Sequence, residues 1–150
     1  VGIDVKELIK DLNKAYCDEW LAFYSYWFMN KVVTGPGYED MGEFLEKIGD
    51  QELEHAEELA NRIIELGGTP LADPMQIAQN ANAPYPQPPA KTDDYKAIIK
   101  VVTTAEAGAI EVYQKLANKT LGKDHVTYQL VTHIMAEEVQ HEELLEDLLG

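Results

Sequence analysis

Apolar side chains recur every three or four residues along most of the chain, which is the spacing of one face of an α-helix. The first such stretch, over about residues 3–33, ends at Gly35-Pro36-Gly37, where a helix does not continue. The second, over about residues 39–66, ends at Gly67-Gly68-Thr69-Pro70, with glycine just past the last turn and proline soon after. We therefore expect two long helices joined by a short link, and such a link places them antiparallel.

The second half of the chain repeats this arrangement. A third helix is expected to open at Thr92-Asp93-Asp94, where acidic residues favour the positive end of a helix, and to stop at Gly122. Asp124 is placed to cap a fourth helix that runs to Leu149. Each half thus consists of two long helices with a short connection between them.

The stretch between the two halves is rich in proline and too long for a tight link. Asp73-Pro74 is typical of a helix start, so we expect a short helix over about residues 74–79. The following segment, Pro84-Tyr85-Pro86-Gln87-Pro88-Pro89, should be extended. Because neither half alone buries its apolar faces, this stretch is a crossover inside one domain, residues 1–150. The expected fold is all-α, a four-helix bundle with a long crossover between its second and third long helices.

Four glutamates interrupt the apolar faces, one in each long helix. They are Glu19, Glu52, Glu106 and Glu138, each at a position where the pattern calls for an apolar residue. In the second and fourth long helices a histidine follows three residues later, which gives the words Glu52-Leu53-Glu54-His55 and Glu138-Val139-Gln140-His141. Residues three apart on a helix share a face, so each histidine should point into the bundle with its glutamate.

Four unpaired carboxylates inside a bundle would be very unfavourable, so something must neutralise them. Two divalent cations supply four positive charges, and carboxylate and imidazole ligands suit iron, manganese or zinc. Two ions bridged by glutamates lie about 3.5–4 Å apart. We therefore predict a dinuclear metal site, with two terminal and two bridging glutamates and one histidine for each ion. Its ligands would be Glu19, Glu52, His55, Glu106, Glu138 and His141.

Other acidic residues near the two histidines offer alternatives. By helical phase, Glu54, Glu57 and Glu58 point away from the bundle interior. Glu137 lies four residues before the second histidine, and a small shift of phase would bring it into the site in place of Glu138. The phase of the apolar stripe favours Glu138. A plainer interpretation is that the acids are solvated and the histidines simply pack in the core. It requires that the apolar face of each helix is assigned to the wrong positions.

Five further residues have weaker patterns. Tyr26 lies two turns beyond the glutamate of the first helix, where it would hydrogen-bond a ligand, donate an electron or simply pack in the core. Tyr113 has the same place in the third long helix and is expected to pack. His125 and His133 are expected on the surface, and Cys17 is expected to be a small buried residue.

Composition narrows the classes of partner. The chain carries 27 acidic and 12 basic residues, a net charge of −15, and such a surface repels nucleic acid and anionic membranes while it attracts cations. Its single cysteine excludes an intramolecular disulfide and thiolate metal sites. No signal peptide and no run of about 18 apolar residues is apparent, so we expect a cytoplasmic protein.

The first helix has a second apolar side, formed by Trp20, Leu21, Tyr24, Trp27 and Phe28. A helix that is apolar on two sides needs two partners, one within the bundle and one outside it. We therefore expect a homo-oligomer.

These motifs resemble the ferritin-like superfamily over essentially the whole chain. Residues 52–70 look like the second helix of bacterioferritins, and residues 12–26 are similar to the first. Glu106 and Glu138-x-x-His141 complete the ligand set of the bacterioferritin ferroxidase site. Leu53 stands where bacterioferritins carry a haem-ligating methionine, so the resemblance does not extend to haem.

The crossover with its short helix is similar to that of the Dps proteins, yet the first helix lacks the two histidines that the usual Dps site between subunits needs. A bacterioferritin-type site inside a Dps-like subunit is the pattern of the Dps-like proteins. That resemblance implies a di-iron ferroxidase that oxidises ferrous iron with hydrogen peroxide or dioxygen. It also implies iron storage and protection from oxidative stress in a hollow oligomer, by resemblance a dodecamer.

Two alternatives remain open at this point. One is a di-metal peroxidase or manganese-catalase relative that removes peroxide and stores no mineral. The other is a purely structural or DNA-protecting helical shell, although the net charge of −15 disfavours a coat on DNA.

Overall fold

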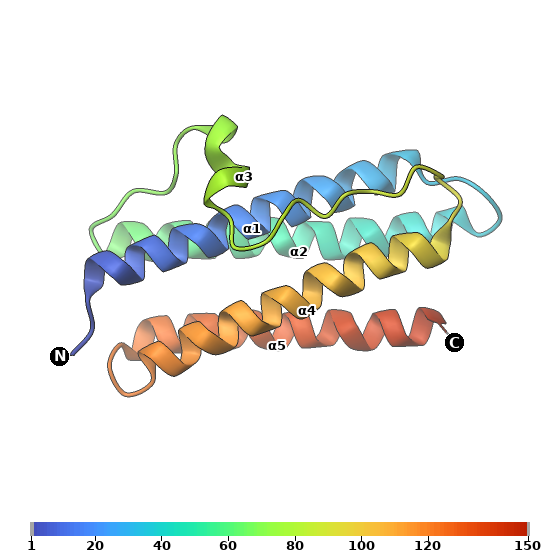
Figure 1. Cartoon of the computed structure of the whole chain (residues 1–150). Helices are drawn as coiled ribbons and strands as arrows, with labels where there is room; N and C mark the ends of the chain where they lie inside the picture. The colour runs from blue at the N-terminus through green and yellow to red at the C-terminus, as the bar shows by residue number, and fades with distance from the viewer. Residues whose placement is uncertain (1, 150) are drawn as a thin grey trace.

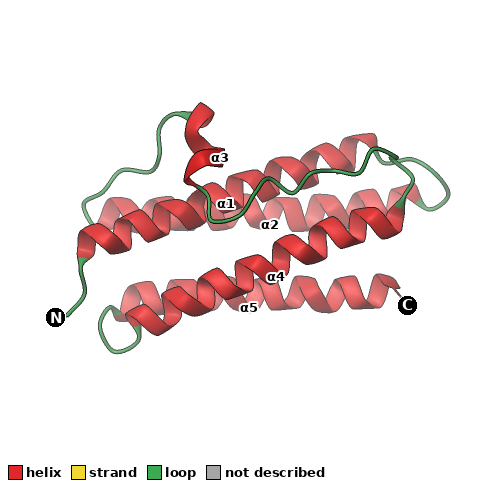
Figure 2. Cartoon of the chain, in the orientation of Figure 1, coloured by secondary structure: helices red, strands yellow, loops and turns green. Residues whose placement is uncertain are grey.

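Two antiparallel pairs of long helices make up the molecule. The computed structural model describes residues 2–149, and Figure 1 shows the two pairs lying side by side. The four long helices are α1 (Val5–Val32), α2 (Tyr38–Glu65), α4 (Tyr95–Thr120) and α5 (His125–Leu149). Helix is the only regular structure in the described range, as Figure 2 shows. The prediction of an all-α four-helix bundle is confirmed.

The start of α4 differs from the sequence-based expectation. Thr92 still belongs to the loop, because its carbonyl accepts a hydrogen bond from the backbone N–H of Thr34 at 3.1 Å and its hydroxyl contacts that of Thr34 at 2.7 Å. Asp94 then caps the helix through a hydrogen bond from the N–H of Ala97 to Oδ1, at 3.1 Å. These contacts between the two loops move the first helical residue to Tyr95.

The long connection contains the expected short helix, although its first turn is tighter than an α-helix. A 3₁₀ turn, Pro74–Gln76, continues into α3 (Ile77–Asn80). Asp73 caps the turn by accepting a hydrogen bond from the N–H of Met75 at 3.0 Å. Figure 1 shows the crossover passing along α1 before it reaches the far end of the molecule, where α4 begins.

Three polar side chains of α1 hold the crossover in place. Asn13 donates to the carbonyl of Thr69 at 3.1 Å, and Ser25 donates to the carbonyl of Pro86 at 2.6 Å. Between them, Asp18 accepts hydrogen bonds from the backbone N–H and the side-chain amide of Asn82, at 2.8 and 2.7 Å. The crossover is therefore fixed to the outer side of α1 at successive points.

Two apolar clusters form the core, one toward each end of the bundle. One contains Leu45 and Val102, and the other contains Leu12 and Ile134. On every long helix, the residues of one cluster come before the buried glutamate and the residues of the other cluster come after it. The glutamates therefore lie between the two clusters. The three- and four-residue spacing of apolar side chains in α1 also predicts a buried position for Val5, but Val5 is 42% exposed. That prediction is wrong, and the buried face of α1 begins at Leu8.

None of the helices in the described range is long and apolar enough to cross a membrane.

Asp124 joins the start of α5 to α2. Its carboxylate accepts hydrogen bonds from the N–H and the hydroxyl of Thr127, at 3.1 and 2.6 Å, and from Nη2 of Arg62 at 3.0 Å. Burial tends to raise the pKa of this carboxyl, but the contacts with Thr127 and Arg62 hold it below its usual value. Asp124 therefore stays ionised, and its contribution to stability is lost only as the pH falls through that lowered pKa.

We expect Asp124→Ala to lower the free energy of unfolding by about 2–3 kcal/mol, because it removes a helix cap and the more buried of the two ion-pair partners of Arg62, whose other partner, Glu65, is exposed. Guanidinium titration of the metal-free protein measures the change. Asp94→Ala is the matched control, because Asp94 caps α4 and forms no ion pair with the residues that the structure describes. Its replacement should cost about 1 kcal/mol. Equal losses in the two variants would contradict the role given to Arg62.

Candidate metal centre

The six predicted ligands meet in the middle of the bundle. Each long helix supplies its glutamate, and α2 and α5 also supply their histidines. None of the six is more than 1% exposed: Glu19, Glu52, His55, Glu106, Glu138 and His141. The helical spacing that predicted a common interior face therefore does bring these residues together.

The six side chains form two overlapping groups of four. One group is Glu19, Glu52, His55 and Glu138, and the other is Glu52, Glu106, Glu138 and His141, with one ligand atom of each residue within 4.8 Å of the rest. Glu52 and Glu138 belong to both groups, which is the arrangement that two bridging glutamates require. Each group takes three residues from one helix pair and one from the other.

The two imidazoles occupy equivalent places. Nδ1 of His55 lies 2.7 Å from Oε2 of Glu19, and Nδ1 of His141 lies 2.6 Å from Oε1 of Glu106. The shared Glu138 places Oε1 3.5 Å from the first Nδ1 and 3.3 Å from the second. In both histidines Nδ1 therefore faces the carboxylates, and Nε2 points the other way.

Two residues that we did not assign to the site contact the outer nitrogens of these histidines. Glu137 places Oε1 2.8 Å from Nε2 of His55, and Gln51 contacts Nε2 of His141 through its side-chain oxygen. Gln51 directly precedes Glu52 but contacts His141 of the second Glu-x-x-His motif. Glu137 directly precedes Glu138 but contacts His55 of the first motif. The repeated position is visible in the sequence, but it does not indicate which histidine each residue contacts. Of the two acids considered in α5, Glu138 lies in the interior of the bundle and Glu137 lies beside Nε2 of His55.

The site is electrostatically unusual in its metal-free form. Burial and the nearby charge of Glu138 raise the pKa of Glu19 to about 8, and burial with the neighbouring carboxylates also raises the pKa values of Glu52 and Glu106. Burial opposes protonation of His55, but the hydrogen bond with Glu19 and the carboxylate of Glu52, 3.1 Å from Nδ1, raise the pKa of the imidazole to about 12. Without cations, protons thus take up part of the negative charge.

Protons do not satisfy all the carboxylate oxygens. Among the described residues, Oε1 of Glu52, Oε2 of Glu106 and both oxygens of Glu138 have no hydrogen-bond partner. Buried polar atoms almost always have partners, so atoms of this kind point to a missing ligand. Oxygen atoms from four carboxylates and nitrogen atoms from two imidazoles are a donor set that iron, manganese and zinc accept. The residues present therefore fit a pair of metal ions.

The weaker predictions divide in two. His125 and His133 are exposed, as expected, and so are Glu54 and Glu57. Tyr26 and Tyr113 are both buried, and neither hydroxyl has a hydrogen-bond partner among the described residues. Burial and the charges of the site glutamates raise the pKa of both hydroxyls. Tyr113 packs in one of the apolar clusters, as predicted, but its hydroxyl has the same unsatisfied position as that of Tyr26.

The thiol of Cys17 is buried on α1. Burial and the adjacent Asp18 raise its pKa to about 11, so it stays protonated near neutral pH. Because the thiolate is the reactive form, we expect alkylation at pH 8 to be at least about 100-fold slower in the folded protein than in guanidinium. Timed labelling followed by mass measurement tests this. Equal rates in the two states would mean that the thiol is accessible.

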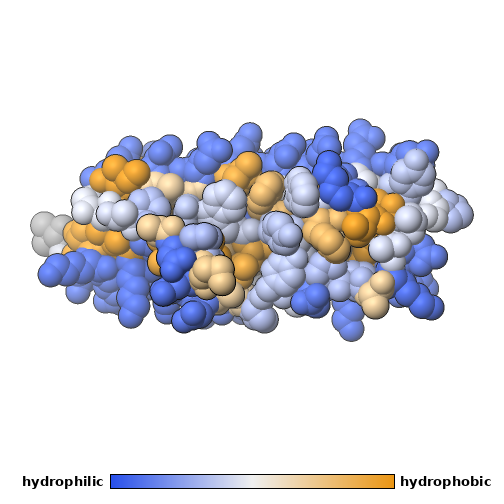
Figure 3. All heavy atoms as spheres, turned by 90° about the horizontal axis from the view of Figure 1, so that it is seen from above, coloured by the Kyte–Doolittle hydropathy of each residue, from blue (hydrophilic) through white to orange (hydrophobic). Residues whose placement is uncertain are grey.

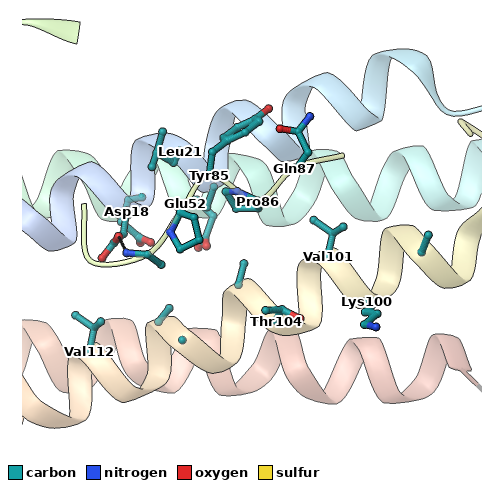
Figure 4. A pocket seen from close by; sticks show the side chains of 18 residues that line it. Asp18, Leu21, Glu52, Tyr85, Pro86, Gln87, Lys100, Val101, Thr104 and Val112 are labelled. Atoms are coloured by element: carbon teal, nitrogen blue, oxygen red, sulfur yellow. Dashed lines mark hydrogen bonds between the residues drawn. The ribbon is translucent and has the colours of Figure 1, made fainter. Parts of the chain in front are cut away.

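A cavity of about 420 Å³ reaches the site from the side of the crossover. Figure 4 shows it between α1, the crossover and α4, with Glu52 at its inner end and Tyr85, Pro86 and Val101 around it. Its lining also includes Glu19. Most of its wall is apolar, and two of the six candidate ligands line it.

Comparison with known proteins places the chain in a family. The sequence profile of the Ferritin family, described as a ferritin-like domain, matches residues 9–150. A DNA protection during starvation protein of Pyrococcus furiosus is 36% identical over 99% of this chain and 80% of its own length. A bacterioferritin of Brucella melitensis is 28% identical over 95% of this chain and 83% of its own length. The chain belongs to the ferritin-like family.

Solved structures lead to the same class of protein. The bacterioferritin-related protein of Bacteroides fragilis, described as a dodecameric thioferritin, is 40% identical over 98% of this chain and 86% of its own, with a TM-score of 0.92. Dps from Thermosynechococcus elongatus has a TM-score of 0.89 over 97% of this chain and 91% of its own, at 20% identity, and thus shares the fold. Within the family, this chain is a Dps-like protein related to bacterioferritins.

Proposed function

We propose that this protein is a ferroxidase, which binds two ferrous ions at the six buried ligands and oxidises them with hydrogen peroxide or dioxygen. The unpartnered oxygens of Glu52, Glu106 and Glu138 carry the proposal, because they face positions that cations would fill. Iron is then the substrate, and manganese and zinc are other possible occupants of the same ligands.

The residues hold the two ions together so that two electrons leave in one event. With hydrogen peroxide, two ferrous ions each lose one electron, the O–O bond breaks, and two protons are taken up to give two water molecules. With dioxygen, the same two electrons and two protons give hydrogen peroxide. Glu52 and Glu138 are positioned to bridge the ions, and Glu19 and Glu106 to bind one each. The apolar cavity would admit the uncharged oxidant.

Tyr26 is proposed to assist this reaction through its unpartnered buried hydroxyl, as a hydrogen-bond or electron donor. We expect Tyr26→Phe to slow ferrous oxidation by about tenfold while two ions still bind, because a donor near the site is lost and no ligand is. Stopped-flow absorbance with a parallel binding titration measures both. An unchanged oxidation rate would leave Tyr26 as a packing residue.

We further propose that the protein assembles into a hollow homo-oligomer, a dodecamer like its thioferritin relative, and stores ferric iron inside. Tyr24, Trp27 and Phe28 of α1 are 54%, 45% and 38% exposed, and such aromatic residues favour an interface. Figure 3 looks onto the side that carries α1 and the crossover, where hydrophobic residues lie between rims of hydrophilic ones. The net charge of −15 favours attraction of ferrous ions.

The experiment adds ferrous iron in steps to the metal-free protein, with hydrogen peroxide or with air. Oxidation is followed by absorbance, and the product is then separated by size. We expect fast oxidation and iron that co-elutes with a high-mass protein particle. Fast peroxide loss with no retained iron would indicate a peroxidase instead. Oxidation no faster than in buffer would contradict the ferroxidase proposal.

A further inference from the structure

Glu137 and Gln51 make the two halves of the candidate metal centre chemically different. The halves otherwise match: each has one terminal glutamate, one histidine and the two shared glutamates. The two residues also match in position, since each directly precedes the glutamate of a Glu-x-x-His word. One is a carboxylate, however, and the other is an uncharged amide.

These residues act on the histidines from outside the ligand set. If Nδ1 of each imidazole binds a cation, Nε2 carries the proton and donates it in a hydrogen bond. His55 then donates to a carboxylate oxygen of Glu137, at 2.8 Å, and His141 donates to the amide oxygen of Gln51. A carboxylate partner makes an imidazole a stronger electron donor to its metal than a neutral amide does.

The other charges nearby do not cancel this difference. Outside the ligand set, the charge of Asp18 acts on Glu19 and the charge of Glu142 acts on Glu106, so an acid stands beside each half. Around Glu137, the imidazole of His133 places Nε2 3.4 Å from its Oε1 and 3.8 Å from Oε2 of Glu58. Two carboxylates therefore face one exposed histidine there, which leaves the half with His55 the more negative.

We propose that the two metal positions are unequal, and that the position formed by Glu19, Glu52, His55 and Glu138 binds a divalent cation more tightly and fills first. Glu137 is then a positioning residue that sets the order of loading through His55. The inference rests on the proposed dinuclear site. From the effect of such partners on metal ligands, we expect the dissociation constants of the two positions to differ by about tenfold or more.

The test uses Co²⁺, which stays divalent in air, with the full-length metal-free protein. Calorimetric titration should show two binding steps. Crystals given one Co²⁺ per subunit should show anomalous density mainly beside His55. Two equally occupied positions in the wild-type protein would overturn the inference while leaving the dinuclear site intact. Failure to bind two ions at all would instead contradict the proposed function.

Exchanging the two residues separates positioning from general charge. Glu137→Gln should weaken the first step about tenfold and leave the second nearly unchanged. The double variant Gln51→Glu with Glu137→Gln keeps the total charge, and its crystals should show the stronger density beside His141. An unchanged order in the double variant, or equal weakening of both steps in Glu137→Gln, would overturn the role of Glu137. If Glu137→Gln does not fold, Gln51→Glu alone should tighten the second step, and no change there would count against the inference.

Discussion

Glu138→Ala is expected to slow rapid ferrous oxidation by at least about 100-fold, because it removes a ligand from both ions at once. The same variant should bind fewer than two cations per subunit. Stopped-flow absorbance of the ferric product and a Co²⁺ titration of the metal-free protein measure the two effects. Glu52→Ala should behave in the same way, since Glu52 is the other shared carboxylate.

The control for this experiment lies on the same helix. Glu143 is exposed on α5, so Glu143→Ala removes one negative charge from the protein without touching the buried cluster. Its oxidation rate should stay within about twofold of the wild-type rate, as expected for an isolated surface charge. A wild-type rate in Glu138→Ala would show that oxidation takes place elsewhere, for example on the acidic surface.

Divalent cations are expected to stabilise the fold strongly. A ligand that binds only the folded state at 100 times its dissociation constant adds about 2.7 kcal/mol, so two ions should add about 5 kcal/mol to the free energy of unfolding. The physical source is neutralisation of carboxylates that come from both helix pairs. Thermal or guanidinium unfolding with and without Co²⁺ measures the gain.

Glu138→Gln distinguishes this effect from general screening of the acidic surface. Burial opposes ionisation of Glu138, but contacts with His141 and Glu52 and the charge of His55 hold the pKa of its carboxyl below the usual value. The metal-free variant should therefore be no more stable than the metal-free wild type near neutral pH, because the amide loses this attraction. It should also gain less than half as much from Co²⁺. An equal gain in variant and wild type would place the stabilising cations outside the buried cluster.

Much of this molecule could be predicted from local pattern. The long helices were predicted from the helical spacing of apolar residues and from Gly67, Pro70 and Gly122, which mark helix ends. Both signals depend only on residues close together in the sequence. The single glutamates stood out for the same reason, each occupying an apolar position. The start of α4 was placed too early because the contacts of Thr92 with Thr34 join loops far apart in sequence.

The partners of the histidine Nε2 atoms were missed for a related reason. Gln51 and Glu137 lie four residues before a histidine, which suggests a contact within one helix. In the structure each contacts the histidine of the other long helix. Such a contact depends on how α2 and α5 face each other, and a single-helix pattern carries no information on that. Likewise, the phase of α4 gives the position of Tyr113 but not the lack of a partner for its hydroxyl among the described residues.

Each group of candidate ligands takes three side chains from one helix pair and the fourth from the other. A half-length chain with one such pair would therefore hold an incomplete site, and only a second copy of itself would complete it. The two helix pairs thus supply ligands as the two subunits of a homodimer would, and the crossover joins them into one chain. Joining the halves also frees them to diverge, since a change in one is no longer copied into the other. Glu137 and Gln51 are such a divergence, which a symmetric dimer of identical chains could not carry.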